Sequence, residues 1–216
     1  MATNLKGKRV LITSGPTWVP IDSVRVISNT ATGETGILLA NGFVQQGCQT
    51  TLLLGVASVR NLDSKVKLKR FQFFQDLSIL LKKELLKDYD IIIQAAAISD
   101  FALEHVCKTK INSECKKLKL TLKPTAKIIN CLRNLAPAAF LVGFKFEPGA
   151  EKKELIIKTH NLVKSAKLDL AVGNNFLRQK YQSYLVSPTK IAGPFLSKLA
   201  MARNLIKLIG REYARN

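Results

Sequence analysis

Segments with the pattern of β-strands alternate with helix-like segments along most of this 216-residue chain. Strands are predicted at residues 8–14, 49–54, 66–74, 89–94, 140–144 and 168–172, and helices at 37–46, 76–86, 124–134, 151–164 and 196–214. Residues 89–94 carry a continuous apolar run, as a buried parallel strand does. Strand–helix–strand order predicts an α/β fold, a Rossmann-like open, mostly parallel sheet with helices on both faces. We expect a single domain over residues 1–216, with a short hairpin within 181–191.

The segment between the first strand and the first helix, residues 14–36, is too long for a simple connection, because such loops usually take two to six residues. It sits at the carboxyl end of the first strand, where open α/β sheets bind ligands. A helix that begins near Gly33 would point N–H groups at that crevice. Small and hydrogen-bonding residues are concentrated in it: Gly15, Ser28, Asn29, Thr30, Thr32, Gly33 and Gly36. The segment predicts a site for a phosphate-bearing ligand. The alternative is a capped helix after a loop whose polar residues bind no ligand.

Two further stretches are candidates for the same site. QAAAISDF, residues 94–101, ends the fourth strand with small residues that allow a flat ligand to approach the backbone, and Asp100 stands at the crevice edge. Asp100 could equally be an N-cap or turn residue. Residues 107–123 read as two short β segments around a polar turn, which predicts a protruding ribbon or flap over about 104–123.

The second ribbon segment alternates apolar Leu118, Leu120 and Leu122 with polar residues, so one face must be covered, most simply by a partner subunit. Lys108 and Lys110 share one face of the first segment. They could close over a phosphate or remain solvated.

Composition limits the other possibilities. The formal net charge is +19; a lysine-rich surface of no specific purpose and attraction for polyphosphate substrates are both compatible with it. Aromatic residues are not interleaved with the basic ones, so no specific nucleic-acid site is predicted. The four cysteines show no metal-ligand spacing and are expected as free thiols. Since no 18-residue apolar run and no secretory signal are visible, we expect a cytoplasmic protein without membrane contact.

Ordinary dinucleotide and P-loop sites are not indicated. No GxGxxG joins the first strand to its helix, the second strand ends in Leu54 and Gly55 rather than an acid, and no GxxxxGK[ST] occurs. An NAD(P)-dependent reductase therefore stays a weak alternative.

Residues 12–36, ITSGPTWVPIDSVRVISNTATGETG, resemble the opening of phosphopantothenoylcysteine synthetase (phosphopantothenate–cysteine ligase). The likeness continues through AAAISDF, the KxK segment, the proline-led helix, LVGFKFE and LDLAVGNNF, and so covers nearly the whole chain. The flavin-dependent decarboxylase often fused ahead of this synthetase is absent, so the chain looks like a stand-alone form.

The resemblance implies a ligase of coenzyme A biosynthesis, which joins 4′-phosphopantothenate to cysteine through an acyl-nucleotide. CTP is a more probable co-substrate than ATP on this basis, with Mg²⁺, and a homodimer is expected. Asn29 matches the residue that acts in forming the acyl-nucleotide, and Lys108 matches a lysine on a flap that closes over it. Substrate contacts are expected from Arg25, Ser28, Thr30, Thr32 and Gly33. Nucleotide contacts are expected from Gly15, Ala96, Asp100, Lys110, Pro124, Phe144, Lys164 and Asn174, and no protein metal ligand is predicted.

The chain also departs from the family pattern. Glu34 replaces a lysine, His160 stands where a second phosphate-binding lysine is expected, Asn175 replaces an aspartate, and Ile111 leaves a KxKK motif one lysine short. These departures keep open an alternative, a diverged nucleotide-binding paralogue with altered or lost activity.

Overall fold

A computed structural model describes residues 5–114 and 117–214. Its centre is an eight-stranded sheet with the order β12-β11-β10-β9-β6-β1-β4-β5. The six strands from β10 to β5 are parallel, and β11 and β12 extend the sheet as an antiparallel hairpin. The predicted Rossmann-like α/β class is confirmed. The strands are β1 (Arg9–Ser14), β4 (Gln49–Leu54), β5 (Lys67–Arg70), β6 (Ile91–Gln94), β9 (Phe140–Phe146), β10 (Leu170–Leu177), β11 (Lys180–Val186) and β12 (Ile191–Phe195).

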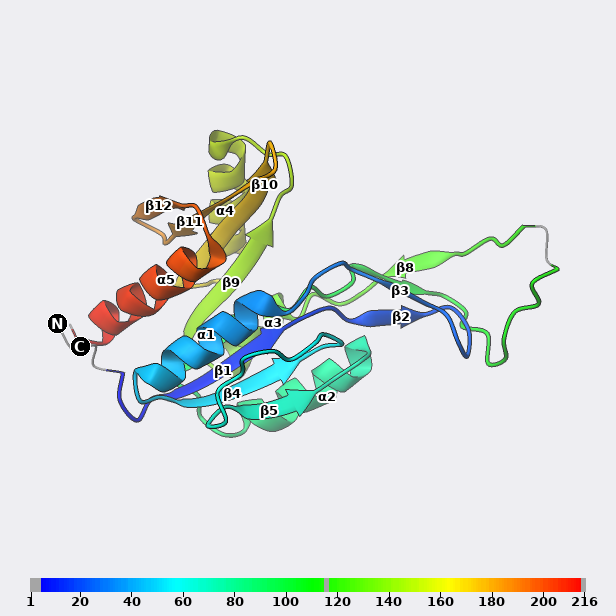
Figure 1. Ribbon diagram of the computed structural model, residues 1–216, viewed down its shortest axis with the longest axis horizontal. Helices are drawn as coiled ribbons and strands as arrows, with labels where there is room; N and C mark the ends of the chain where they lie inside the picture. Colours follow the sequence, from blue (N-terminus) through cyan, green and yellow to red (C-terminus); the bar gives the residue numbers. More distant parts are fainter. Residues whose placement is uncertain (1–4, 115–116, 215–216) are drawn as a thin grey trace.

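Helices cover both faces of this sheet (Figure 1). α1 (Glu34–Gln45) and α5 (Lys198–Tyr213) pack on one face, around the fully buried Phe43. α2 (Phe74–Leu85), α3 (Ile129–Leu135) and α4 (Lys152–Ser165) pack on the other. Side chains on the central strands alternate between the two layers: Leu52 and Leu54 lie in the first and Leu53 in the second. The sheet is therefore buried on both faces along its middle, as its apolar sequence indicated.

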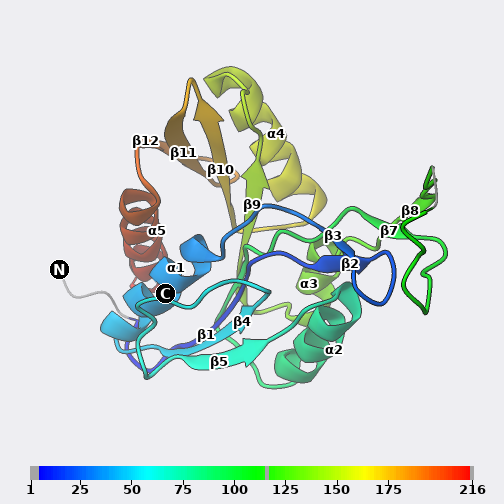
Figure 2. The same cartoon turned by 45° about the vertical axis from the view of Figure 1, so that its right-hand side comes forward.

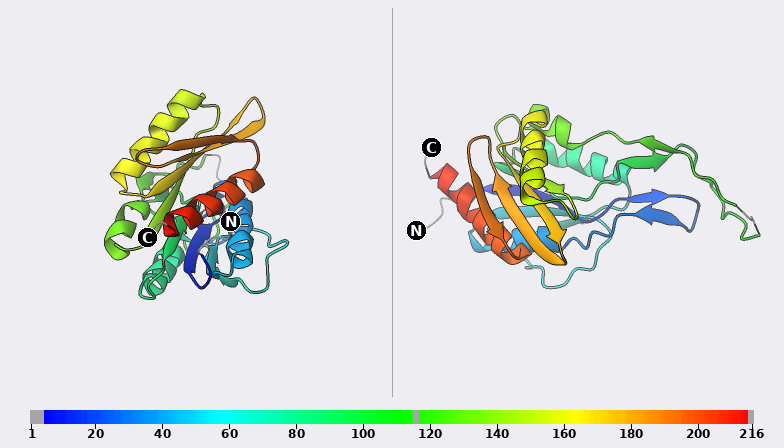
Figure 3. Two further views of the ribbon diagram at one scale, coloured as in Figure 1. Left: turned by 90° about the vertical axis from the view of Figure 1, so that its left-hand side faces the viewer. Right: turned by 90° about the horizontal axis from the view of Figure 1, so that it is seen from above.

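An arm leaves the carboxyl edge of the sheet and extends well beyond it; Figure 2 and the right panel of Figure 3 show it from two further sides. We use "the arm" for residues 18–28 and 101–124. Its first part is a hairpin of β2 (Trp18–Pro20) and β3 (Val26–Ser28), and its second pairs β7 (Phe101–Leu103) with β8 (Leu122–Pro124). The hairpin lies inside the segment that the sequence presented only as a long loop. Three-residue strands leave too short a pattern to detect, and Val19 is the one buried residue in this strand pair.

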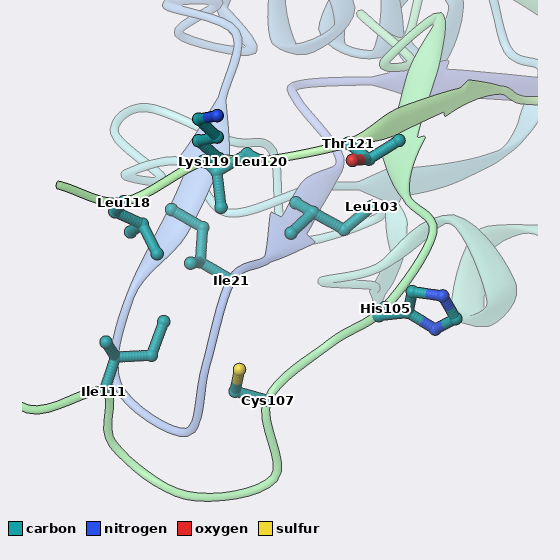
Figure 4. Close-up of a pocket in the computed structure, with 9 residues that line it drawn as sticks. All are labelled: Ile21, Leu103, His105, Cys107, Ile111, Leu118, Lys119, Leu120 and Thr121. Atoms are coloured by element: carbon teal, nitrogen blue, oxygen red, sulfur yellow. The ribbon is translucent and has the colours of Figure 1, made fainter.

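The predicted ribbon needs correction. The structure forms a two-stranded ribbon, but Leu122 and its neighbours pair with residues 101–103 instead of with 107–111. Of residues 104–121, those that the structure describes contain no strand, and Cys115 of the predicted turn lies outside the described residues. The leucine alternation is real, but its cause is a cavity within the arm: Leu118 and Leu120 line it together with Ile21 and Leu103 (Figure 4).

Several predicted boundaries also shift. Pro124 ends β8 and does not open a helix. The residues that follow it form a loop, and α3 begins only at Ile129. The third strand ends at Arg70, since Asp76 accepts a hydrogen bond from the Phe73 N–H (2.9 Å) and so fixes the start of α2. The predicted hairpin after residue 180 is confirmed as β11–β12. None of the helices within the described residues is long and apolar enough to cross a membrane.

Candidate active site

A short extension continues β1 and β6 beyond their carboxyl ends, where open α/β sheets bind ligands; we call this edge the crevice. The Ala97 N–H donates to the Gly15 carbonyl (2.9 Å), and the Thr17 N–H donates back to Ala97 (3.2 Å). The Asn29 side chain reaches this extension from the base of the β2–β3 hairpin, directly after β3: its Nδ2 donates to the Ala97 carbonyl at 3.0 Å. Since Nδ2 is fixed in this way, the exposed amide presents its oxygen and remaining N–H at the mouth of the crevice. Asn29, Gly15 and Ala96 are therefore brought together at the carboxyl edge.

The start of α1 is pressed against the end of β1. Gly33 caps the helix with a φ of 75°, a left-handed conformation that favours glycine. One turn on, a Cβ at residue 36 would lie 2.2 Å from the Ser14 Cβ, so only glycine allows this approach. The Ser14 hydroxyl donates to the Gly33 carbonyl and accepts from the Gly36 N–H, both at 3.2 Å. The two glycines of the sequence motif thus fix the helix N-terminus beside the crevice.

The helix N-terminus is less available to an anion than the sequence suggested. The Gly36 N–H is engaged by Ser14, and the Glu34 N–H lies 3.5 Å from the Thr32 hydroxyl. Glu34 also places a carboxylate in the first turn, where it interacts favourably with the helix dipole but would repel a phosphate. Lys198 of α5 binds that carboxylate at 2.5 Å and offsets its charge.

The predicted nucleotide residues divide into two groups. Phe144 and Asn174 lie on neighbouring strands of the carboxyl edge, Asn174 opposite Phe146 in the register, and Asp100 is exposed at the root of the arm. Lys164 lies elsewhere. It belongs to the last turn of α4, and a crossover helix runs antiparallel to its strands, so this turn sits at their amino ends. Pro124 lies in the arm.

The predicted substrate residues and the two predicted flap lysines are also split between crevice and arm. Thr30, Thr32 and Gly33 follow Asn29 directly, and the Ser28 hydroxyl donates to the Asn29 carbonyl at 3.0 Å. Lys108 and Lys110 are exposed in the irregular part of the arm. Lys108 is separated from Asn29 by the length of the hairpin, because the N–H of its neighbour Cys107 donates to the Ile21 carbonyl near the hairpin tip (3.1 Å).

Arg25 is tied into the arm by Asp22. Its guanidinium donates to Asp22 Oδ2 (2.6 Å) and to the Ile111 carbonyl (3.2 Å), and the Ile111 N–H donates to the same carboxylate at 3.1 Å. Burial of Asp22 alone would raise its pKa, but N–H groups of Val24, Ile111 and Arg25 together with the guanidinium outweigh this and lower the pKa to about 2. Asp22 thus joins the hairpin tip to residue 111.

The other three departures from the family pattern, at Asn175, His160 and Ile111, can be explained from the residues around them or placed by their contacts. Asn175 is fully buried and donates to the Ala150 carbonyl at 2.6 Å, so it positions the loop before α4 without a buried charge. His160 lies 3.4 Å from the Pro188 carbonyl. The Ile111 side chain lines the arm cavity, where a lysine would place its stem among apolar neighbours (Figure 4).

One feature that the sequence reasoning missed is an aromatic cluster beside Phe144. Phe146 and Phe176 meet edge to face with ring centroids 6.3 Å apart, and Phe176 and Tyr181 do so at 5.6 Å. Phe146 and Phe176 remain about half exposed. Strand alternation puts Phe144 and Phe146 on one face of β9, and Asn174 and Phe176 on the same face of β10. The spacing of Phe144 and Phe146 could have indicated this cluster from the sequence, because residues two apart on a strand share one face.

Residues 5–212 match the model of the family described as the DNA/pantothenate metabolism flavoprotein C-terminal domain. The chain belongs to this family. The match confirms the resemblance seen in the sequence motifs. The curated relatives of this chain include coenzyme A biosynthesis bifunctional proteins CoaBC. Identity is 32% to the protein from Thermococcus kodakarensis, over 98% of this chain and 47% of the relative, and 31% to that from Methanocaldococcus jannaschii, over 97% and 52%. The chain spans about half the length of these relatives.

Solved structures of other proteins share the fold. The DNA/pantothenate metabolism flavoprotein from Streptococcus pneumoniae superimposes with a TM-score of 0.85 at 22% identity, over 96% of this chain and 100% of that one. The Cab2 mutant H337A, in a structure described as a complex with phosphopantothenate-cysteine, gives a TM-score of 0.79 at 22% identity, over 96% and 88%. At these identities the likeness establishes the fold only. The substrates of this chain have to be inferred from its own site.

Proposed function

We propose that this chain is a phosphopantothenate–cysteine ligase that works through an acyl-nucleotide. The observation that carries the proposal is the fixed amide of Asn29, held by Ala97 at the mouth of the crevice beside the Gly15 and Gly33 turns. The names of the relatives and the complex described for Cab2 support a reaction of coenzyme A biosynthesis. Phosphopantothenate carries a carboxylate at one end and a phosphate at the other, which suits a crevice lined by hydroxyl and amide groups.

Each step needs positioning and neutralisation of charge more than a protein nucleophile. A carboxylate oxygen of phosphopantothenate bonds to the α-phosphorus of the nucleoside triphosphate, and pyrophosphate leaves. The amine of cysteine then attacks the acyl carbon; the nucleoside monophosphate leaves and the amine loses a proton. Asn29 orients the carboxylate and then the mixed anhydride, with Thr30, Thr32 and Gly33 around it. Gly15, Ala96, Asp100, Phe144 and Asn174 serve the nucleotide.

The aromatic cluster of Phe146, Phe176 and Tyr181 extends the nucleotide part of the site outward and offers ring edges and faces to a base. CTP is the expected nucleotide, by resemblance to the family. Within the described residues no group of three or more His, Cys, Asp or Glu side chains gathers that could hold a metal ion. Mg²⁺ is expected with the nucleotide by resemblance to the family, and bound mainly through phosphate oxygens and water it would neutralise charge on the phosphates.

We further propose that the protein is a homodimer joined through the arm. Large apolar side chains are concentrated there and more than a third exposed: Val24, Val26, Ile27, Phe101, Val106, Leu118, Leu120 and Leu122. An exposed apolar surface of this kind usually marks an interface, and a two-fold axis would let it meet its own copy. A second copy could also bring its Arg25, Lys108 and Lys110 toward a crevice that they do not reach within one chain. A single chain in gel filtration at high concentration would contradict the dimer.

Pyrophosphate release tests the proposed reaction. Purified protein with Mg²⁺ is given each of the four nucleoside triphosphates, with and without phosphopantothenate, and we expect release that requires phosphopantothenate and is fastest with CTP. Asn29→Asp should lower this rate about 100-fold or more, the loss typical of one group that stabilises developing charge. Asn134→Asp, at an exposed position of α3, is the matched control. Release without phosphopantothenate, or none with any nucleotide, favours the diverged nucleotide-binding paralogue.

Lys108→Gln should slow amide formation from the acyl-nucleotide more than it slows pyrophosphate release, because the expected flap closes after activation. Single-turnover measurement of the two half-reactions separates these effects, and Lys207→Gln on α5 is the control. Equal losses in both half-reactions would refute this assignment of Lys108.

A further inference from the structure

A second cavity, of about 330 Å³, lies at the opposite end of the sheet from the crevice, against the first residues of β1 and β4. Its polar lining includes Arg9, Thr51, Lys65, Lys67, Lys87 and Tyr89. At about 3.3 Å per residue, the length of β1 puts it on the order of 20 Å from Gly15. None of the residues assigned to the candidate active site lines this cavity.

The floor of this cavity is a buried, charge-compensated network. Glu84 is fully buried; its Oε1 accepts from the ammonium groups of Lys69 and Lys87, and its Oε2 accepts from the Tyr89 hydroxyl at 2.6 Å. Tyr89 is also 3.0 Å from the Thr51 hydroxyl. Two cations therefore face one anion, and the carboxylate that lines the cavity has both oxygens occupied. Its negative charge is more than offset before any ligand enters.

The rim adds further cations that lack a carboxylate partner. Lys65 and Lys67 are exposed, and the Arg9 guanidinium lies over the Tyr89 ring at 5.2 Å from the centroid. Among residues 5–114 and 117–214, no side-chain carboxylate forms an ion pair with these three groups. The acids nearest in the chain are engaged: Asp63 accepts from the Lys65 N–H (2.9 Å), and Asp90 accepts from the Arg9 N–H (2.8 Å) and from Lys8 (2.9 Å).

From this arrangement we infer a second anion site, one that takes a small phosphate-bearing molecule. Several cations converge on a concave surface whose only lining acid is already neutralised, which is the condition for a positive local potential. The volume is at the small end of ligand pockets, so inorganic phosphate, pyrophosphate or the phosphate end of a metabolite fits better than a whole nucleotide. Arg9 on β1 and Lys67 on β5, with β4 between them, would each donate a charge-assisted hydrogen bond to the phosphate. The inference does not depend on the proposed ligase activity.

NMR titration of the full chain with pyrophosphate, without Mg²⁺, tests the inference, because amide shifts report each end of the sheet separately. We expect saturable shifts at Arg9, Thr51 and Lys67, distinct from any at Gly33. Lys67→Gln should weaken this binding about tenfold, the effect of losing one charge-assisted hydrogen bond. The double variant with Arg9→Gln and Lys67→Gln should weaken it further. Lys82→Gln, which removes the same charge from an exposed site on α2 outside the cavity, should leave the affinity unchanged.

Three results would overturn the inference. Absence of saturable shifts at the β1 and β4 amino ends shows that the cavity holds only water. Equal weakening by Lys67→Gln and Lys82→Gln shows unspecific screening of a basic surface. A short single-stranded oligonucleotide that produces the same shifts at a lower phosphate concentration shows a polyanion surface in place of a small-molecule site. Since Lys67 is exposed, its substitution leaves the fold intact, and shifts at Gly33 in the same spectra show whether the other site survives.

Discussion

The sheet and the arm of this molecule are built in opposite ways. In the sheet, side chains such as Leu52 and Ile92 are completely buried between two layers of helices. In the arm, a small cavity is lined mainly by residues outside the two short strand pairs, and Leu118, Leu120 and Leu122 stay 37–48% exposed. The order of the arm rests on polar contacts, above all those of Asp22 with residues 24, 25 and 111.

This contrast shows which part of the molecule can change without loss of the fold. Burial of apolar surface gives the sheet most of its stability, at roughly 25 cal/mol per Å². The arm has little to bury within one chain, so its conformation can be coupled to a ligand or to a second copy at small energetic cost. The candidate active site lies at the junction between the rigid sheet and the arm, whose conformation can change.

The largest effect is expected in the rigid part, at Glu84. Glu84→Gln should lower the free energy of unfolding at neutral pH by about 3 kcal/mol, because it leaves the Lys69 and Lys87 charges without their buried partner. Equilibrium urea unfolding measures it, and Glu151→Gln, at an exposed position before α4, is the control. A change below about 1 kcal/mol would mean that the lysines are solvated well enough alone.

The same residue predicts a pH dependence. Burial would raise the pKa of Glu84, but hydrogen bonds from Lys69, Lys87 and Tyr89 outweigh it and lower the pKa from 4.5 to about 2. The folded-state pKa is depressed, so the stabilisation is complete above about pH 5 and is lost as pH falls toward 2. The difference between wild type and Glu84→Gln should therefore shrink over that range. A difference that stays constant to pH 2 would contradict the pKa.

The contrast also explains how far the sequence could be interpreted. The strands of the sheet were predictable because burial on both faces imposes a pattern on consecutive residues, as in Ile91, Ile92 and Ile93. The position of Gly15, Asn29, Gly33 and Gly36 near the end of β1 was predictable, because they belong to the long segment that joins β1 to α1. The pairing of β7 with β8 was not, since it joins residues about twenty positions apart through an irregular segment. Lys164 was assigned to the nucleotide from the motif alone, whereas the strand–helix–strand order already puts the last turn of α4 at the amino ends of its strands.

An intermediate effect is expected in the arm, at Asp22. Asp22→Asn should release Arg25 and the Ile111 N–H and increase amide hydrogen exchange across residues 104–114, while exchange in β1 and β6 stays unchanged. Because the pKa of Asp22 is lowered to about 2, the arm of the wild type should hold above pH 4 and loosen as pH falls toward 2. Cooperative loss of protection in the sheet as well would show that arm and sheet are one folding unit.

The smallest effect on folding, and the most informative about assembly, is expected at Leu120. Within one chain Leu120→Ala removes a side chain that is more than a third exposed, so the free energy of unfolding should fall by less than about 1 kcal/mol, against about 2–5 kcal/mol for Leu52→Ala in the sheet. If the arm joins two copies, the same substitution should weaken the dimer in sedimentation, and its destabilisation should grow with protein concentration, because association stabilises by mass action. A small loss that is independent of concentration would mean that these leucines cover only their own cavity, and the dimer would then have to use another surface.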